Sequence, residues 1–66
     1  MYRIVLTADR GGAGDALSIH EAEGIDVARI ESQAWSLLRE HASANPPPVG
    51  WRIEDEIESV IATSKT

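Results

Sequence analysis

The side chains best suited to metal binding in this sequence are two histidines and the carboxylates near them. His20 is followed by Glu21 and Glu23, and His41 is the second histidine. Imidazole and carboxylate groups bind transition metals where several of them converge on one point. Successive residues of a strand point to opposite faces, so His20 and Glu21 diverge if this segment is a strand. The sequence therefore predicts no metal site, and no residue pattern indicates another cofactor.

A second group of residues suited to chemistry is the acidic run Glu54, Asp55, Glu56 and Glu58. General acid–base catalysis needs carboxylates held in distinct environments inside a cleft, which a chain this small rarely encloses. The run is better interpreted as a solvated turn or the start of a helix. No serine lies in a G-x-S-x-G nucleophile motif. We therefore expect a protein that is not an enzyme.

The glycine-rich stretch RGGAGD, residues 10–15, resembles a phosphate-binding loop in composition only. Such a loop leads into the N-terminus of a helix and often carries a Lys-Ser or Lys-Thr pair. Here the residues that follow are typical of a strand, and no lysine is nearby. We interpret the stretch as the connection of a β-hairpin.

The charge balance argues against several classes of partner. Asp and Glu outnumber Lys and Arg by 11 to 6, which gives a net charge of −5. Proteins that bind nucleic acid or an anionic membrane present a basic face, so neither partner is expected. The apolar runs are too short for a transmembrane helix, and the first residues lack a signal-peptide pattern. We expect a soluble, cytoplasmic protein.

The length of 66 residues predicts one domain, residues 1–66, with a small core. A domain of this size buries only about 60% of the surface that its unfolded chain exposes. The sequence contains no cysteine, so disulfides and thiolate metal sites are excluded as additional stabilisation. Association with a second copy is the remaining way to enlarge the core, and we expect a homo-oligomer, most simply a dimer.

Two strands are predicted in the first third of the chain. Residues 2–8 are rich in β-branched and aromatic residues, and in residues 16–22 Leu17 and Ile19 alternate with Ser18 and His20. Alternation separates their side chains into two sets. The set expected to face the core comprises Tyr2, Ile4, Leu6, Leu17 and Ile19. The set expected on the opposite face comprises Arg3, Val5, Thr7, Ser18 and His20.

An amphipathic helix is predicted to follow, with Asp26 as its N-cap. Apolar residues recur at spacings of three and four, which is typical of one helix face. This face comprises Val27, Ile30, Ala34, Leu37, Leu38 and His41. Trp35 falls at its border, with Arg39 one turn later as a candidate cation–π partner. The helix is expected to end at Asn45, because the three prolines that follow cannot continue it.

The last segment fits two templates. As a hairpin with a turn near Glu56 and Ile57, it places Trp51 and Ile53 opposite Val60 and Ala62. As a helix over residues 52–63, its isoleucines and Val60 fall on one face. The strand-like flanks WRI and SVIAT favour the hairpin, although no Asn-Gly or Asp-Gly turn is present. The prediction is an α+β fold of order ββαββ, one antiparallel sheet with one helix on one face, and the alternative is ββαα.

The order YRIVL, loop, strand, helix, GWRIEDE and VIAT resembles small bacterial ββαββ proteins of unknown function. In those proteins the closing hairpin typically carries an Asp-Gly type turn, where this chain has EIES. The first half is also similar to the antitoxin component of bacterial HicAB systems, but it lacks that family's proline-containing stretch before the helix. The first resemblance implies the fold and no particular function.

The sheet face opposite the helix is expected to carry few charges, which favours a partner surface. Trp35 at the helix border fits two roles equally well, the edge of the core and an interface anchor. The candidate interaction surface therefore comprises Val5, Thr7, His20, Trp35, Arg39, Arg52 and Ile61. The first functional hypothesis is a self-associating protein-interaction module. The alternative is an acidic regulator, similar in this to an antitoxin, that binds a basic partner protein through the carboxylates of residues 54–58.

Overall fold

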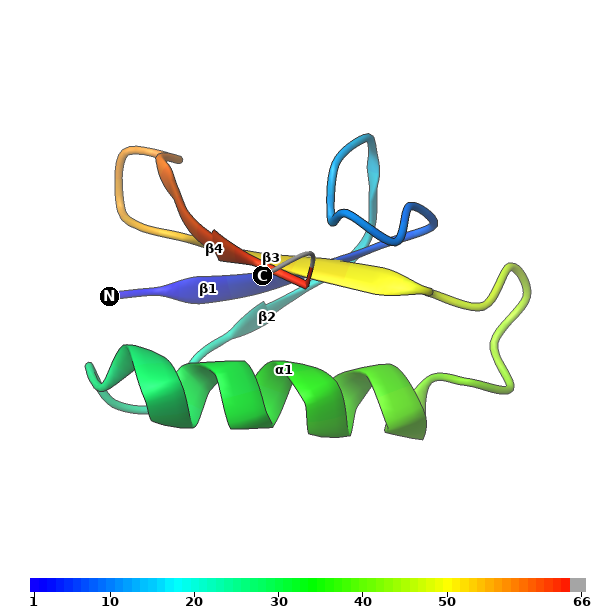
Figure 1. The fold of residues 1–66 in the computed structure, drawn as a ribbon, viewed down its shortest axis with the longest axis horizontal. Coiled ribbons are helices and arrows are strands. Elements are labelled where there is room, and N and C mark those ends of the chain that lie inside the picture. The colour runs from blue at the N-terminus through cyan, green and yellow to red at the C-terminus, as the bar shows by residue number, and fades with distance from the viewer. Residues whose placement is uncertain (65–66) are drawn as a thin grey trace.

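In a computed structural model that describes residues 1–64, the chain folds in the order β-β-α-β-β. The strands form one antiparallel four-stranded sheet of order β2-β1-β3-β4, and the helix lies on one face of it (Figure 1). The elements are β1 (Arg3–Thr7), β2 (Ala16–Glu21), α1 (Val27–Glu40), β3 (Gly50–Glu54) and β4 (Val60–Thr63). This confirms the predicted α+β fold and excludes the alternative helix over residues 52–63.

The closing hairpin turns without a glycine because the carboxylate of Asp55 organises the turn. Its Oδ1 atom accepts hydrogen bonds from the backbone amides of Ile57 and Ser59, at 3.0 and 2.9 Å. Glu58 adopts a left-handed backbone with φ of 64°. An aspartate side chain that binds the backbone two residues on is a recognised turn device. Part of the acidic run therefore builds the turn, which lies at Glu56 and Ile57 as predicted, although the expected Asn-Gly or Asp-Gly signal is absent.

The helix begins as predicted and ends earlier than predicted. Asp26 is the N-cap, and its side chain accepts a hydrogen bond from the Ala28 amide at 3.1 Å. The last helical residue is Glu40, with His41 as C-cap, whereas the sequence favoured a helix up to Asn45. Residues 42–45 are exposed and contain no large apolar side chain. Short helices depend on the packing of an apolar face. Residues 42–45 have no such packing to stabilise a further helical turn before the prolines.

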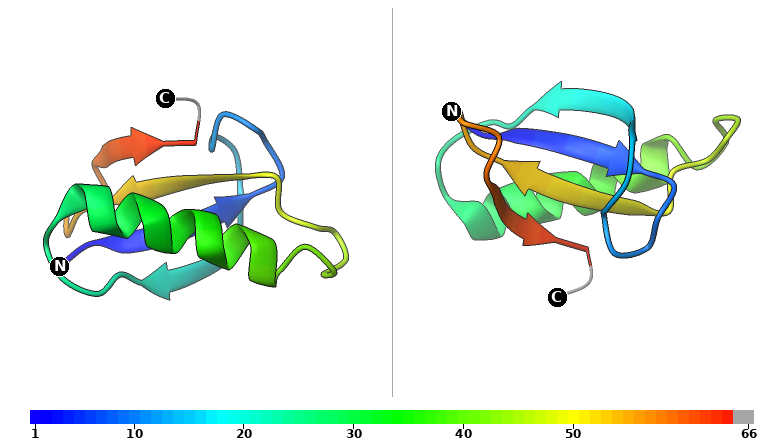
Figure 2. Two further views of the ribbon diagram at one scale, coloured as in Figure 1. Left: turned by 60° about the horizontal axis from the view of Figure 1, so that its bottom comes forward. Right: turned by 90° about the horizontal axis from the view of Figure 1, so that it is seen from above.

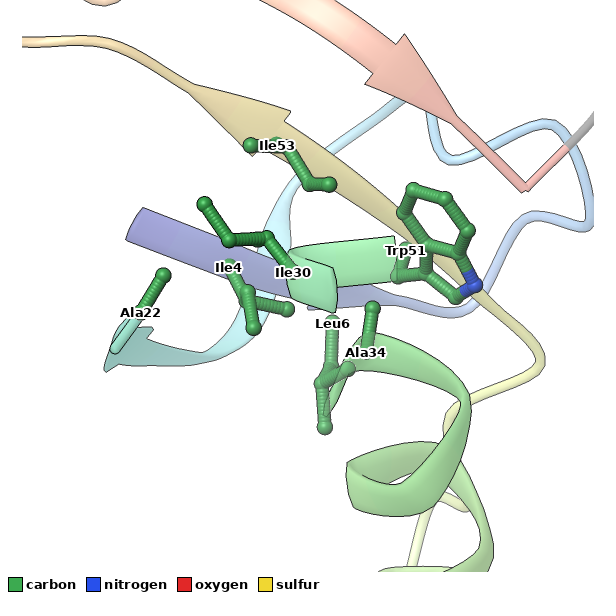
Figure 3. Close-up of a cluster of buried hydrophobic side chains, with 7 residues drawn as sticks. All are labelled: Ile4, Leu6, Ala22, Ile30, Ala34, Trp51 and Ile53. Carbon is green, nitrogen blue, oxygen red and sulfur yellow. The ribbon is translucent and has the colours of Figure 1, made fainter. Parts of the chain in front are cut away.

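The core lies between α1 and the two central strands. Ile4 pairs in register with Ile53, and Leu6 with Trp51, so that all four face the helix. Helix α1 packs chiefly on β1 and β3. The buried cluster shown in Figure 3 comprises Ile4, Leu6, Ala22, Ile30, Ala34, Trp51 and Ile53. Each of these side chains is at most 7% exposed, which agrees with the predicted helix face and with the predicted inward set of β1.

The second strand faces the other way from the prediction. Its register with β1 pairs Ile4 with His20 and Leu6 with Ser18, which places His20 and Ser18 on the helix side. Ile19 pairs with Val5 on the helix-free side and is 56% exposed. Leu17, expected inside, is the extra residue of a bulge and is 40% exposed. A shift of one residue exchanges the two faces of a strand, and the pattern of β2 alone does not determine this register.

The β1–β2 connection folds over the helix-free face near the start of β3 (Figure 2, right). The Nη1 atom of Arg52 donates to the carbonyl oxygens of Gly12 and Gly14, at 3.1 and 2.8 Å. The Ser64 hydroxyl donates to the Arg10 carbonyl at 2.6 Å and accepts from the Trp51 amide at 3.1 Å. The glycine-rich stretch is therefore a hairpin connection, as predicted, that is fastened to β3.

Within residues 1–64 no helix combines the length and the apolar character needed to cross a membrane.

Candidate interaction surfaces

Two of the predicted surface residues are buried. Val5 is 1% exposed and Thr7 is 0% exposed, although both lie on the helix-free face as predicted. The Thr7 hydroxyl donates to the carbonyl of Asp9 at 3.0 Å at the start of the folded-over connection. Both residues are covered by neighbouring parts of this chain, so neither offers a side chain to a partner.

The helix-free face also carries an ion cluster, which corrects the expectation of a sparsely charged surface. Arg3 donates from Nε to Glu54 at 2.9 Å and from Nη2 to Glu58 at 2.9 Å. Arg52 donates from Nε to the second oxygen of Glu54 at 2.7 Å. The register places Arg3 on β1 beside Glu54 on β3, so the two central strands bring the cluster together. Alternation along β1 and β3 places these residues on one face, but only the pairing of the two strands brings them together.

The electrostatics of this cluster favour the ionised form of the Glu54 carboxylate. Hydrogen bonds from Arg52, and then from Arg3, lower the pKa of Glu54 from its ordinary value of 4.5, and its burial opposes this shift. The pKa of Arg3 is raised by its hydrogen bonds to Glu58 and Glu54. Arg52 therefore has a structural role between Glu54 and the β1–β2 connection, whereas the sequence placed it on a partner surface.

What remains apolar and accessible on the helix-free face lies toward its two edges. Ile19 on β2 and Val60 on β4 are on this face by register, and they are 56% and 52% exposed. Next to them are the bulge residues Leu17 and Ile61, at 40% and 39%. Ile61 belongs to the predicted candidate surface and is accessible, whereas Val5 and Thr7 are buried. Ile19, Leu17 and Val60 are the residues that the sequence pattern missed.

A groove of about 560 Å³ runs between α1 and the outer strand β2. Its lining comprises His20, Glu21, Glu23, Ser32, Gln33, Ser36, Leu37 and Glu40. Three of these residues are acidic, and none is lysine or arginine. Gln33 and Ser36 lie outside the predicted apolar face of the helix, and the groove was not predicted from the sequence.

Two contacts hold α1 beside β2 along this groove. The Gln33 side chain accepts from the amide of Glu23 at 3.0 Å and donates to its carbonyl at 2.9 Å. The rings of His20 and His41 lie with centroids 5.1 Å apart, at 42° to each other. His20 is thus positioned by the end of α1 and lies on the opposite face of the sheet from the one predicted.

The remaining predicted surface residues lie on the helix. Trp35 is 46% exposed, and its ring contacts Trp51 edge to face with centroids 5.5 Å apart. By helical periodicity Trp35 lies on the flank of α1 away from the groove. Arg39 is exposed in the last turn of α1. The ring of Trp35 contacts that of Trp51, and within residues 1–64 it makes no cation–π contact with the predicted partner Arg39.

One hydroxyl–imidazole pair forms in the structure, and the sequence had given no sign of it. The Ser18 hydroxyl lies 3.0 Å from Nε2 of His20. A hydrolytic triad needs a third group that orients the imidazole, usually a carboxylate, and the recorded ring neighbour of His20 is His41. Among residues 1–64 no group of three or more His, Cys, Asp or Glu side chains is arranged to hold a metal ion.

Comparison with models of protein families, with curated proteins and with solved structures gives no match to this chain.

Proposed function

We propose that this chain is a non-enzymatic protein-interaction module that self-associates through the helix-free face of its sheet. The observation that carries the proposal is the pair of half-exposed side chains, Ile19 and Val60, on the face that α1 leaves uncovered. Contact between two copies along β2 and β4, outside the part of this face that the β1–β2 connection covers, would remove these side chains from water. The gain is about 25 cal/mol for each Å² of apolar surface removed from water.

The charges on this face are compatible with a second copy. The ion cluster on this face joins two cations, Arg3 and Arg52, to two anions, Glu54 and Glu58. Its charges therefore balance. The chain as a whole carries a net charge of −5, and its excess of acidic groups lies outside this cluster. Because like charges facing each other oppose association, the neutral cluster makes this face more suitable for self-contact than the acidic parts of the surface.

The oligomeric state at micromolar concentration tests the proposal. We expect sedimentation equilibrium to show a dimer, and Ile19→Lys or Val60→Lys to weaken dimerisation by about tenfold or more. The matched control is Ile25→Lys, because Ile25 is 83% exposed in the connection between β2 and α1. A wild-type chain that remains monomeric at these concentrations would overturn the proposal, as would equal effects of the three substitutions.

A further inference from the structure

We infer that the outer edge of β2 and the groove beside it bind an extended segment of another protein that carries lysine or arginine side chains. The segment would add to the sheet next to β2 and place its basic side chains in the groove. This inference goes beyond self-association, because it uses the outer edge of β2 and the groove on its helix side. The two surfaces share the half-exposed side chain of Ile19.

The first observation is the free edge of β2. In the described part of the chain, β1 is the strand paired with β2, and no strand pairs with its outer side. Ser18–Glu21 keep an unbroken register with β1, so their backbone is regular enough to template another strand. Natural edges are often protected by lysine, proline or a bulge. Strand β2 contains no lysine or proline, and its bulge at Leu17 lies before the regular stretch Ser18–Glu21. Strand addition to such an edge is a common mode of peptide recognition.

The second observation is that contacts within the fold fix α1 relative to β2, so the groove between them is preformed. The paired hydrogen bonds between Gln33 and the backbone of Glu23 fix α1 past the end of β2. The contact of His20 with His41 fixes the C-terminal end of the helix on the same strand. A preformed groove reduces the ordering that binding requires, which favours affinity for a short segment.

The charges of the groove decide which segment fits. Glu21, Glu23 and Glu40 line it, and no lysine or arginine does. A second copy would bring the same acidic groove against itself, and a nucleic acid would bring phosphates, so both are disfavoured by like-charge repulsion. A segment with positive side chains is complementary. Its attraction is screened by salt, because the groove is open to solvent.

The geometry of a strand also predicts the order of residues in the bound segment. Side chains of an added strand alternate between the groove side and the helix-free side, where Ile19 is half-exposed. The preferred segment therefore alternates basic with apolar residues. A peptide of repeated Lys-Val units is the simplest probe. Its controls are a Glu-Val peptide of equal length and a Lys-Val peptide interrupted by proline, which cannot donate the backbone hydrogen bonds of a strand.

Fluorescence anisotropy with these three labelled peptides tests the inference on the full chain. We expect the Lys-Val peptide to bind at least about tenfold more tightly than either control. Hydrogen exchange should slow at the amides of Ile19 and Glu21 when the peptide is bound, because these two amides point away from β1. Equal binding of the proline-interrupted peptide, without protection of these amides, would show electrostatic adsorption and would overturn strand addition. Equal binding of the Glu-Val peptide would overturn the charge preference.

Two charge reversals on α1 locate the site. Glu40→Lys changes the groove, whereas Glu31→Lys makes the same charge change on α1 outside the groove lining. We expect the first to weaken Lys-Val binding by about tenfold and the second by no more than about twofold. Equal losses would assign the binding to net charge alone and would overturn the site. Neither reversal should alter sedimentation, so failure of this inference is distinguishable from failure of the proposed dimer.

Discussion

The indole rings of Trp35 and Trp51 meet edge to face, with ring centroids 5.5 Å apart and planes at 90°. Trp51 is 1% exposed and belongs to the core, whereas Trp35 is 46% exposed on α1. The half-exposed indole therefore covers the edge of the buried one. This pair links the helix to the central strand β3.

The first prediction concerns this aromatic pair. Trp35→Ala should lower the free energy of unfolding by about 1–2 kcal/mol, because it removes an aromatic contact and part of the cover of Trp51. Trp51→Ala should lower it by about 3–5 kcal/mol or leave the chain unfolded, because it opens a cavity in a small core. Urea denaturation measures both. Ile57→Ala, at a position 81% exposed, is the control and should change stability by less than about 0.5 kcal/mol.

The second prediction concerns two glycines that the folded-over connection requires. A Cβ atom at Gly12 would overlap the carbonyl oxygen of Trp51, and one at Gly50 would overlap the carbonyl oxygen of Asp9. Each alanine substitution should lower the free energy of unfolding by at least about 2 kcal/mol, because backbone atoms must shift. Gly14→Ala is the matched control. Gly14 has φ of +85° but open space around it, so only backbone strain of about 1 kcal/mol is expected. Thermal unfolding that ranks Gly14→Ala level with Gly50→Ala would contradict this account.

The third prediction concerns the pH dependence of stability. The folded protein lowers the pKa of Glu54 below its ordinary value of 4.5, so the folded state binds this proton less tightly than the unfolded chain does. The contribution of Glu54 is therefore fully present above pH 4.5 and is lost as the pH falls through the folded pKa. Glu54→Gln should be less stable near neutral pH, and its stability should fall less steeply in acid. Urea midpoints measured across the acid range for this variant, the wild type and Glu31→Gln as control would show the difference. Parallel curves for all three proteins would contradict it.

The fourth prediction concerns the side chain that fastens α1 past the end of β2. Gln33→Ala removes both hydrogen bonds to the backbone of Glu23 and should lower the free energy of unfolding by about 1 kcal/mol. Gln33→Glu keeps an acceptor for the Glu23 amide but loses the donor to its carbonyl. Hydrogen exchange at the Glu23 amide should therefore accelerate more in the alanine variant than in the glutamate variant. The same exchange rate in both variants would show that the amide is protected by other contacts.

Features that depend on neighbours in the chain were predictable from the sequence. The N-cap Asp26 is confirmed, because capping depends on residues within one helical turn. The buried residues Ile30 and Ala34 are confirmed as well, because helical periodicity places them on the same face. The closing hairpin was preferred on the strand-like composition of its two flanks, and it is confirmed without the expected turn signal. Asp55 supplies that turn through its side chain, a role that a run of four acidic residues obscures.

The candidate surfaces were less predictable, because they depend on which strands become neighbours. Arg3 and Glu54 are far apart in the chain and meet only in the register of β1 with β3. Val5 and Thr7 were placed on the correct face, but the connection after β1 and the neighbouring side chains bury them. His20 was placed on the wrong face, because the alternation in β2 does not say which of its two faces is turned to the helix.

The sequence by itself determined the order of the elements, the start and buried face of the helix, and the hairpin connection after β1. These features rest on interactions between residues a few positions apart, which the local pattern records. The tertiary structure decided the strand order, the facing of β2, the ion cluster and the groove between β2 and α1. The physical reason is that strand register and bulge position depend on contacts between distant segments. A bulge at Leu17 and the pairing of Ile4 with His20 turn apolar residues toward solvent and a histidine toward the helix.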